Sequence, residues 1–170
     1  MSIKPQLADT ANWKKIAGDG EITFENGSMT IPDGACVSYV GEKFGNKLFS
    51  FRVKFEKENA ENALNGAIYF RLGNPDNRIW SSNTGYLLWI KDATLEYQKW
   101  APGQDLISYD NDWIKAGTEY EITVGVYDMA DDKVKYEVWV DNEKVFEKEV
   151  TGANLHGEEG YLGFSTGGAP

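Results

Sequence analysis

The sequence predicts an all-β domain made of two stacked antiparallel sheets. Short segments in which apolar and polar residues alternate follow one another along almost the whole chain. Tight-turn pairs such as Asn26-Gly27 and Asp141-Asn142 separate these segments, and helix-favouring composition is confined to one short stretch, residues 57–64. Many short strands joined by tight turns are typical of an antiparallel β-sandwich, because alternate side chains then share one core.

The strands are expected in a simple order along the chain. A hairpin at Asn26-Gly27 joins residues 21–25 to residues 28–31, because both turn positions tolerate positive φ. Further strands are expected at residues 35–40, 48–55, 67–72, 86–90, 94–100, 106–109, 120–127, 133–140, 144–150 and 161–165. Gly, Asn and Asp residues lie between most of these segments, as expected for turns.

One parity of each strand is apolar and predicts the core. Its members are Phe49, Phe51, Val53, Phe55, Ile68, Phe70, Leu72, Ile122, Val124, Val126, Val134, Tyr136, Val138 and Val140. The opposite parity directs Tyr69, Arg71 and Trp139 away from that core. Residues 86–90 are apolar on both faces, which indicates a central strand covered on both sides or a strand lined by ligand.

Length and charge restrict the kind of protein. A chain of 170 residues suits one domain with a sizeable core, so we expect residues 1–170 to form a single β-sandwich. The net charge of −10, without a basic cluster, opposes binding to nucleic acid or to anionic membranes. No apolar run is long enough to insert into a bilayer. A neutral partner or a divalent cation fits this charge better.

The N-terminal segment lacks the apolar run of a secretory signal. A cytosolic protein and a module of a longer secreted chain both fit that observation. We expect the second, an extracellular module.

The aromatic residues suggest a ligand. The chain has 6 Trp and 9 Tyr, and Trp89, Trp100 and Trp139 fall beside polar or charged residues. A flat ring next to hydrogen-bonding groups is suited to hold the apolar face of a sugar. The alternative is that a second sheet or a loop covers these rings.

The longest polar connection, residues 73–85, is a second candidate for binding. Amides, a carboxylate and a guanidinium can bond paired hydroxyls while a ring stacks on the sugar. This segment offers Asn74, Asp76, Asn77, Arg78, Trp80, Ser81, Ser82 and Asn83. The alternative is a solvated loop that Ile79 and Trp80 merely anchor.

The sequence patterns typical of metal sites and of reactive side chains are weak in this chain. The acidic stretch at residues 110–113 could ligate a structural calcium ion, but it lacks EF-hand spacing, and solvated turn acids are the alternative. No other cofactor is expected. Cys36 lies in an alternating strand pattern and is interpreted as a buried, small apolar residue, and His156 is the one histidine.

Several segments together resemble the concanavalin A-like jelly-roll domains. They are residues 39–51, 66–72, 85–91 and 95–100 and the run Gly160-Tyr-Leu-Gly-Phe164. The resemblance covers nearly the whole chain and is greatest to bacterial carbohydrate-binding modules. It implies two curved antiparallel sheets, with ligand on the concave sheet or on loops at its rim. Laminin-G-like domains, legume lectins and several glycosidases belong to the same superfamily.

Catalysis is not expected. Retaining glycosidases need two carboxylates about 5–5.5 Å apart, and no strand carries such a run; Glu119 and Glu121 are the nearest pair. No Gly-x-Ser-x-Gly elbow or phosphate loop is present either.

We therefore predict a non-catalytic carbohydrate-binding module that binds a polysaccharide or oligosaccharide, tethered to a catalytic domain in a longer chain. The candidate ligand-binding residues are Tyr69, Arg71, Trp80, Asn83, Trp89, Lys91, Gln98 and Trp100. Arg71 and Lys91, as two cations on one face, suggest an anionic or furanose-rich glycan. The alternatives are a laminin-G-like protein–protein adhesion module and a glycoside hydrolase or lyase domain.

Overall fold

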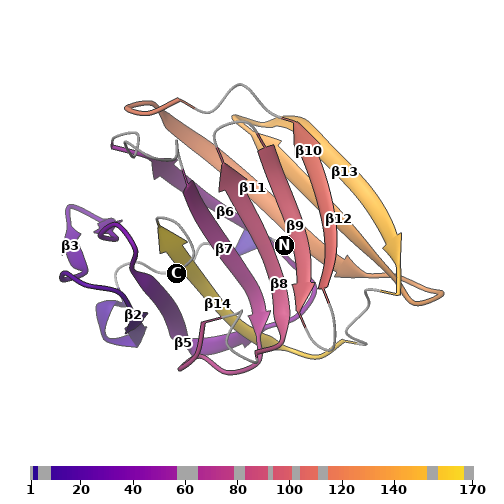
Figure 1. Ribbon diagram of the computed structural model, residues 1–170, viewed down its shortest axis with the longest axis horizontal. Helices are drawn as coiled ribbons and strands as arrows, with labels where there is room; N and C mark the ends of the chain where they lie inside the picture. The colour runs from indigo at the N-terminus through magenta and orange to yellow at the C-terminus, as the bar shows by residue number, and fades with distance from the viewer. Residues whose placement is uncertain are drawn as a thin grey trace.

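The computed structural model describes residues 2–3, 9–56, 65–78, 83–91, 94–100, 104–110, 115–152 and 157–166. Two sheets are stacked face to face (Figure 1). The seven-stranded sheet has the order β10 (Gln104–Asp110), β9 (Thr94–Trp100), β8 (Gly85–Lys91), β7 (Asn65–Leu72), β14 (Gly160–Thr166), β5 (Cys36–Phe44) and β2 (Trp13–Ala17). The five-stranded sheet has the order β1 (Ser2–Ile3), β6 (Lys47–Lys54), β11 (Glu119–Asp128), β12 (Lys133–Val140) and β13 (Glu143–Thr151).

The predicted all-β, two-sheet antiparallel sandwich is confirmed. Every predicted strand is present, whereas β1 and β2 were not predicted. Only the pairing of β1 with β6 is parallel among the described strands. One 3-10 turn, η1 (Thr10–Asn12), precedes β2. The helix-favouring residues 57–64 lie outside the described part of the chain.

The predicted tight turns are also confirmed. Asn26 and Gly27 have φ of 51° and 76° and join β3 (Thr23–Glu25) to β4 (Ser28–Thr30). Asp141 and Asn142 have φ of 49° and 69° between β12 and β13. Positive φ at both central positions gives a turn whose twist matches that of the paired strands.

The core lies between the two sheets. Its buried members include Ile68, Phe70, Tyr86, Leu88, Tyr97, Phe49, Ile122, Val124, Tyr136 and Val138. The rings of Tyr97 and Tyr136 meet across the sheets with centroids 4.4 Å apart. The Tyr97 hydroxyl donates to the Glu137 carbonyl at 3.1 Å, so this buried polar group is satisfied. The predicted core parity holds in β6, β11 and β12, and in β7 as far as Phe70.

The parity of β7 changes at Arg71, which corrects the prediction for Leu72. Tyr161 pairs with Leu72 but Gly163 pairs with Tyr69, so β7 has one residue more than β14 between these pairs. Arg71 itself has φ of 53°, which is uncommon for a residue with a Cβ. Because one extra residue exchanges the two faces of a strand, Leu72 leaves the core side and Arg71 turns towards it.

Candidate functional site

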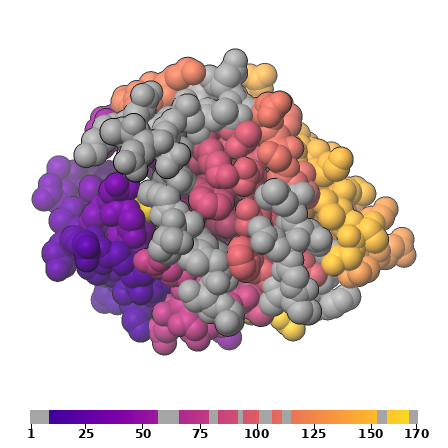
Figure 2. Space-filling model, in the orientation of Figure 1, coloured from indigo at the N-terminus to yellow at the C-terminus, as the bar shows by residue number. Residues whose placement is uncertain are grey.

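The outer face, meaning the face of the seven-stranded sheet directed away from the core, carries most of the predicted ligand-binding residues. Strand β8 contributes Trp89 and Lys91, and β9 contributes Glu96, Gln98 and Trp100. We call these five residues the β8–β9 surface. Figure 2 shows atoms of both strands at the surface near the middle of this face.

The register of β8 and β9 sets the layout of this surface. Trp89 lies opposite Glu96, Leu87 opposite Gln98, and Gly85 opposite Trp100. Trp89 and Trp100 therefore lie on different strands, four positions apart, which corresponds to about 13 Å along the strand direction. Both indoles are half-buried and pack against the apolar residues Ala67, Tyr69, Leu72 and Leu87.

Trp100 is held by its polar edge. Its Nε1–H donates to Oε1 of Gln98 at 3.1 Å, and Gln98 is itself buried. Gly85, directly opposite on β8, is buried, and a Cβ there would lie 2.8 Å from the Phe70 carbonyl oxygen and 2.9 Å from that of Arg71. The hydrogen bond to Gln98 fixes the orientation of the partly exposed indole, and a flat apolar ring held in this way can stack on a flat ligand.

Trp89 is covered on one side by a cation. The Lys91 Nζ lies 4.3 Å from the centroid of the Trp89 ring and 2.7 Å from Oε1 of Glu96. The Thr94 hydroxyl lies 3.5 Å from the same carboxylate oxygen. The ammonium group is therefore attracted both by the ring face and by the carboxylate. Glu96 is not among the residues predicted for the site, and the pairing of β8 with β9 places it opposite Trp89.

Tyr69 belongs to the outer face but is fully buried, with 0% of its surface exposed. Burial raises the pKa of the Tyr69 phenol far above its usual value, and Cys36 Sγ lies 3.7 Å from the hydroxyl. Burial likewise raises the pKa of the Cys36 thiol. Cys36 is thus the inert buried residue that was predicted. Tyr69 forms the floor of the face beside Leu87.

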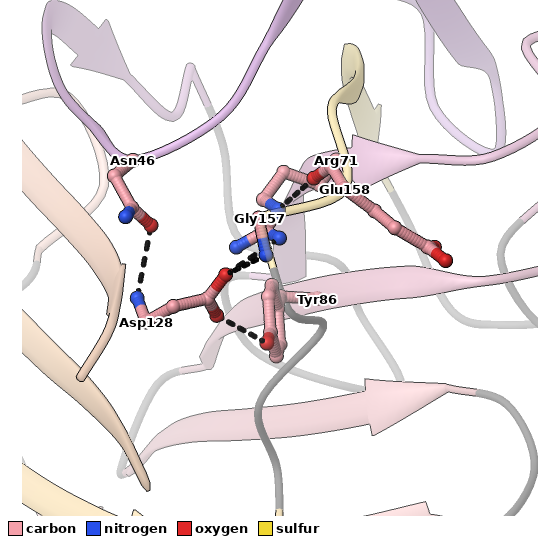
Figure 3. Close-up of polar contacts among 6 residues, drawn as sticks. All are labelled: Asn46, Arg71, Tyr86, Asp128, Gly157 and Glu158. Carbon is pink, nitrogen blue, oxygen red and sulfur yellow. Dashed lines mark hydrogen bonds and ion pairs between the residues drawn. The ribbon is translucent and has the colours of Figure 1, made fainter. Parts of the chain in front are cut away.

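The structure places Arg71 away from the outer face (Figure 3). Its Nη2 lies 2.9 Å from Oδ2 of Asp128, with side chains only 1% and 10% exposed, and its Nε donates to the Glu158 carbonyl at 2.5 Å. The guanidinium also lies over the ring of Tyr86, 5.5 Å from its centroid. Arg71 therefore joins the two sheets, and we leave it out of the proposed site.

Asp128 accepts further hydrogen bonds in the same cluster. Its Oδ2 accepts from Gly157 N at 2.6 Å, and its Oδ1 lies 3.5 Å from the Tyr86 hydroxyl. The Asp128 N–H donates to Oδ1 of Asn46 at 2.9 Å. The cluster connects β7 and β8 with β11, whereas the buried Nη1 of Arg71 has no hydrogen-bond partner within the described ranges.

Asn83 shapes the loop after β7. Its Oδ1 accepts from the backbone N–H of Asn74 at 2.8 Å and of Thr84 at 2.9 Å. Its Nδ2 donates to the carbonyls of Asn74 at 2.7 Å and Asn77 at 2.9 Å. These four bonds occupy both lone pairs of the Asn83 amide oxygen and both of its N–H donors. Asn83 therefore has no hydrogen-bonding group left for a ligand, and we do not include it in the proposed site. Trp80 lies among residues 79–82, outside the described part of the chain.

The described residues show neither a cluster of metal ligands nor a membrane span. Among them, no group of three His, Cys, Asp or Glu side chains is placed to hold a metal ion. The acidic stretch that begins at Asp110 continues into residues 111–114, which are not described, so calcium binding there stays a prediction. The described chain contains no helix with the length and hydropathy needed to cross a bilayer.

The sequence matches no protein-family model and no curated protein. Solved structures share its fold at low identity. The carbohydrate recognition domain of Emp46p, in its metal-free form, has a TM-score of 0.60 at 12% identity, covering 97% of this chain and 93% of that one. An alginate lyase, Aly36B, in complex with alginate trisaccharide has a TM-score of 0.60 at 14% identity, covering 96% and 81%.

A third similar structure is a β-1,3-1,4-glucanase (lichenase) from a mouse hindgut metagenome. Its TM-score is 0.59 at 14% identity, covering 92% of this chain and 81% of that one. Identities this low establish the fold alone. The chain therefore has a concanavalin A-like jelly-roll fold, which both a carbohydrate recognition domain and polysaccharide-cleaving enzymes adopt.

Proposed function

We propose that this protein is a non-catalytic carbohydrate-binding module that holds an oligosaccharide or polysaccharide on the β8–β9 surface. The observation that carries the proposal is the half-buried Trp100 ring, whose Nε1–H is bonded to Gln98 on the outer face. The C–H face of a sugar ring stacks on such an indole, because both surfaces are flat and apolar.

Polar groups next to the rings supply hydrogen bonds to hydroxyls. The Lys91 ammonium and the Glu96 carboxylate present a donor and an acceptor 2.7 Å apart, at the Trp89 end of the surface. Neighbouring hydroxyls on a sugar ring can bond to both groups. The Lys91–Glu96 pair therefore fixes the orientation of a sugar whose stacking is otherwise tolerant of rotation.

The number of carboxylates on β8 and β9 favours a binding function over catalysis. Glu96 is the one acidic residue that β8 and β9 contribute, and it is bonded to Lys91. A glycosidase requires two carboxylates flanking the scissile bond, one of them free to transfer a proton. We further propose that the module works outside the cell, attached to a polysaccharide-active protein, in keeping with the lichenase and the lyase among its structural neighbours.

The proposal is tested by Trp100→Ala, with Trp139→Ala as the matched control. Trp139 is also half-buried, but it lies on the far side of the five-stranded sheet, with Lys144 Nζ 5.1 Å from its ring centroid. Affinity electrophoresis against a panel of soluble polysaccharides, followed by calorimetry on oligosaccharides, measures binding. Truncating a central aromatic contact weakens binding by about 2 kcal/mol or more, roughly 30-fold in Kd.

We expect Trp100→Ala to lose binding while Trp139→Ala binds as the wild type does, with both variants folded by circular dichroism. The absence of glycan binding by the wild type would favour the adhesion alternative. Release of reducing ends from a polysaccharide would favour an enzyme.

A further inference from the structure

We propose that the Lys91–Glu96 pair sets the ligand class, and that Glu96 restricts the β8–β9 surface to uncharged glycans. The inference rests on the proposed function and assigns Glu96 a specificity role within it. Without Glu96, the Lys91 ammonium would attract the carboxylate or sulfate of an acidic sugar. When the ammonium is paired with Glu96, it donates hydrogen bonds to uncharged hydroxyls instead.

The geometry of the pair supports this role. The Glu96 side chain is 14% exposed, whereas that of Lys91 is 34% exposed, so the carboxylate is the more deeply placed partner. A uronate that captured Lys91 would leave the Glu96 carboxylate with little water and without its cation. Separating a largely buried charge from its partner is strongly unfavourable. The incoming acid would also lie close to a like charge.

Lys91 is held on its second side as well. Its ammonium lies against the Trp89 ring, 4.3 Å from the centroid, and Trp89 lies directly opposite Glu96 in the strand register. Moving Lys91 towards an acidic ligand would therefore break a cation–π contact together with the ion pair. The ring contact and the ion pair together hold the Lys91 ammonium in position, and the Glu96 carboxylate neutralises its charge.

Two other cations, one near this face and one predicted on it, are neutralised by carboxylates. Lys14 on β2 is paired with Asp76, its Nζ 2.5 Å from Oδ1. Arg78 and Lys43 act on the β7 and β14 part of the outer face: the charge of Arg78 opposes the rise in the pKa of Tyr69, and Lys43 Nζ lies 5.3 Å from the centroid of the Tyr161 ring. Arg71, the second cation on which the expectation of an anionic glycan depended, is bound to Asp128 between the sheets. That expectation is replaced here by a neutral ligand.

The test is the charge-removing variant Glu96→Gln, because Gln keeps the shape and an oxygen that can accept from Lys91. The probes are neutral β-glucan oligosaccharides and oligouronates of equal length, and the readout is the ratio of their Kd values by calorimetry at low and high salt. Glu137→Gln is the matched control: Glu137 is buried in an ion-pair cluster with Lys135 and Lys144 on the other sheet.

The wild type is expected to bind the neutral oligosaccharide and not the oligouronate. Glu96→Gln should shift the ratio towards the oligouronate by about tenfold, the effect of one hydrogen bond to a charged group. Added salt should weaken this gain. Adding Lys91→Met to Glu96→Gln should abolish it, and Glu137→Gln should leave the wild-type ratio unchanged.

Three results would overturn the inference alone while leaving glycan binding established. They are oligouronate binding by the wild type that equals neutral binding, a gain that survives Lys91→Met, and an equal gain in Glu137→Gln. Failure of the wild type to bind either probe or any other glycan would overturn the proposed function and this inference with it.

Discussion

The contact between Arg71 and Asp128 predicts a large loss of stability when one partner is removed. Asp128→Ala leaves the guanidinium of Arg71, whose side chain is 1% exposed, without its carboxylate. Gly157 N and the Tyr86 hydroxyl lose their acceptor in the same step. Several elements therefore lose a shared contact at once.

The magnitude follows from burial. Removing one partner of a buried ion pair destabilises a protein by about 3–5 kcal/mol, because the remaining charge is neither solvated nor paired. For a domain of this length, about 1 kcal/mol lowers Tm by roughly 2–4 °C, so Asp128→Ala should lower Tm by roughly 6–20 °C. Replacing both residues, as Arg71→Met with Asp128→Ala, removes the stranded charge and should recover at least half of the loss.

Scanning calorimetry and urea unfolding measure these changes. Asp76→Ala is the control, since it breaks an ion pair with Lys14 whose side chains are 52% and 61% exposed. An exposed pair of this kind contributes less than about 1 kcal/mol. A shift for Asp128→Ala no larger than that of the control would refute the reasoning. So would a double variant that is no more stable than Asp128→Ala alone.

Two further predictions concern the bulge and a perturbed phenol. A Cβ on Gly160 would lie 2.2 Å from the carbonyl carbon of Arg71, so Gly160→Ala should destabilise by about 1–3 kcal/mol. Gly45→Ala, whose Cβ meets nothing closer than 3.5 Å, should change stability by about 0.5 kcal/mol at most, and equal Tm shifts for the two variants would contradict this packing. Burial, and then the Glu137 carboxylate, raise the pKa of Tyr127 to about 12 from an ordinary value of 10.0, against a smaller opposing effect of Lys135. Because the unfolded phenol ionises first, the stability that Tyr127 contributes is complete below pH 10 and is lost as the pH rises through 12. Tyr127→Phe should remove that pH dependence, and a Tyr127 transition at pH 10 in the absorbance titration would contradict it.

The strands and turns of this protein could be predicted because they depend on neighbours in the chain. Asn-Gly and Asp-Asn pairs adopt positive φ for local steric reasons, so the turns at Asn26 and Asp141 are found where expected. The alternation in β11 and β12 identifies the core face, since each strand directs successive side chains to opposite sides.

The candidate site was only partly predictable. Trp89, Lys91, Gln98 and Trp100 share the outer face as expected from their spacing. No local signal places Lys91 over the Trp89 ring. That contact depends on side-chain packing at a particular register of β8 against β9. The hydrogen bonds that occupy Asn83 likewise depend on how a whole loop closes.

The sequence by itself determined the strand boundaries, the turns and the apolar parity, which depend on short-range sterics and hydrophobic pattern. Only the tertiary structure decided where Arg71 and Leu72 point, because the extra residue in β7 is fixed by its packing against Gly160 on β14. The tertiary structure also decided which charged side chains are neutralised by an ion pair. Ion pairs such as Arg71–Asp128 join residues far apart in the chain, and no local pattern specifies their meeting.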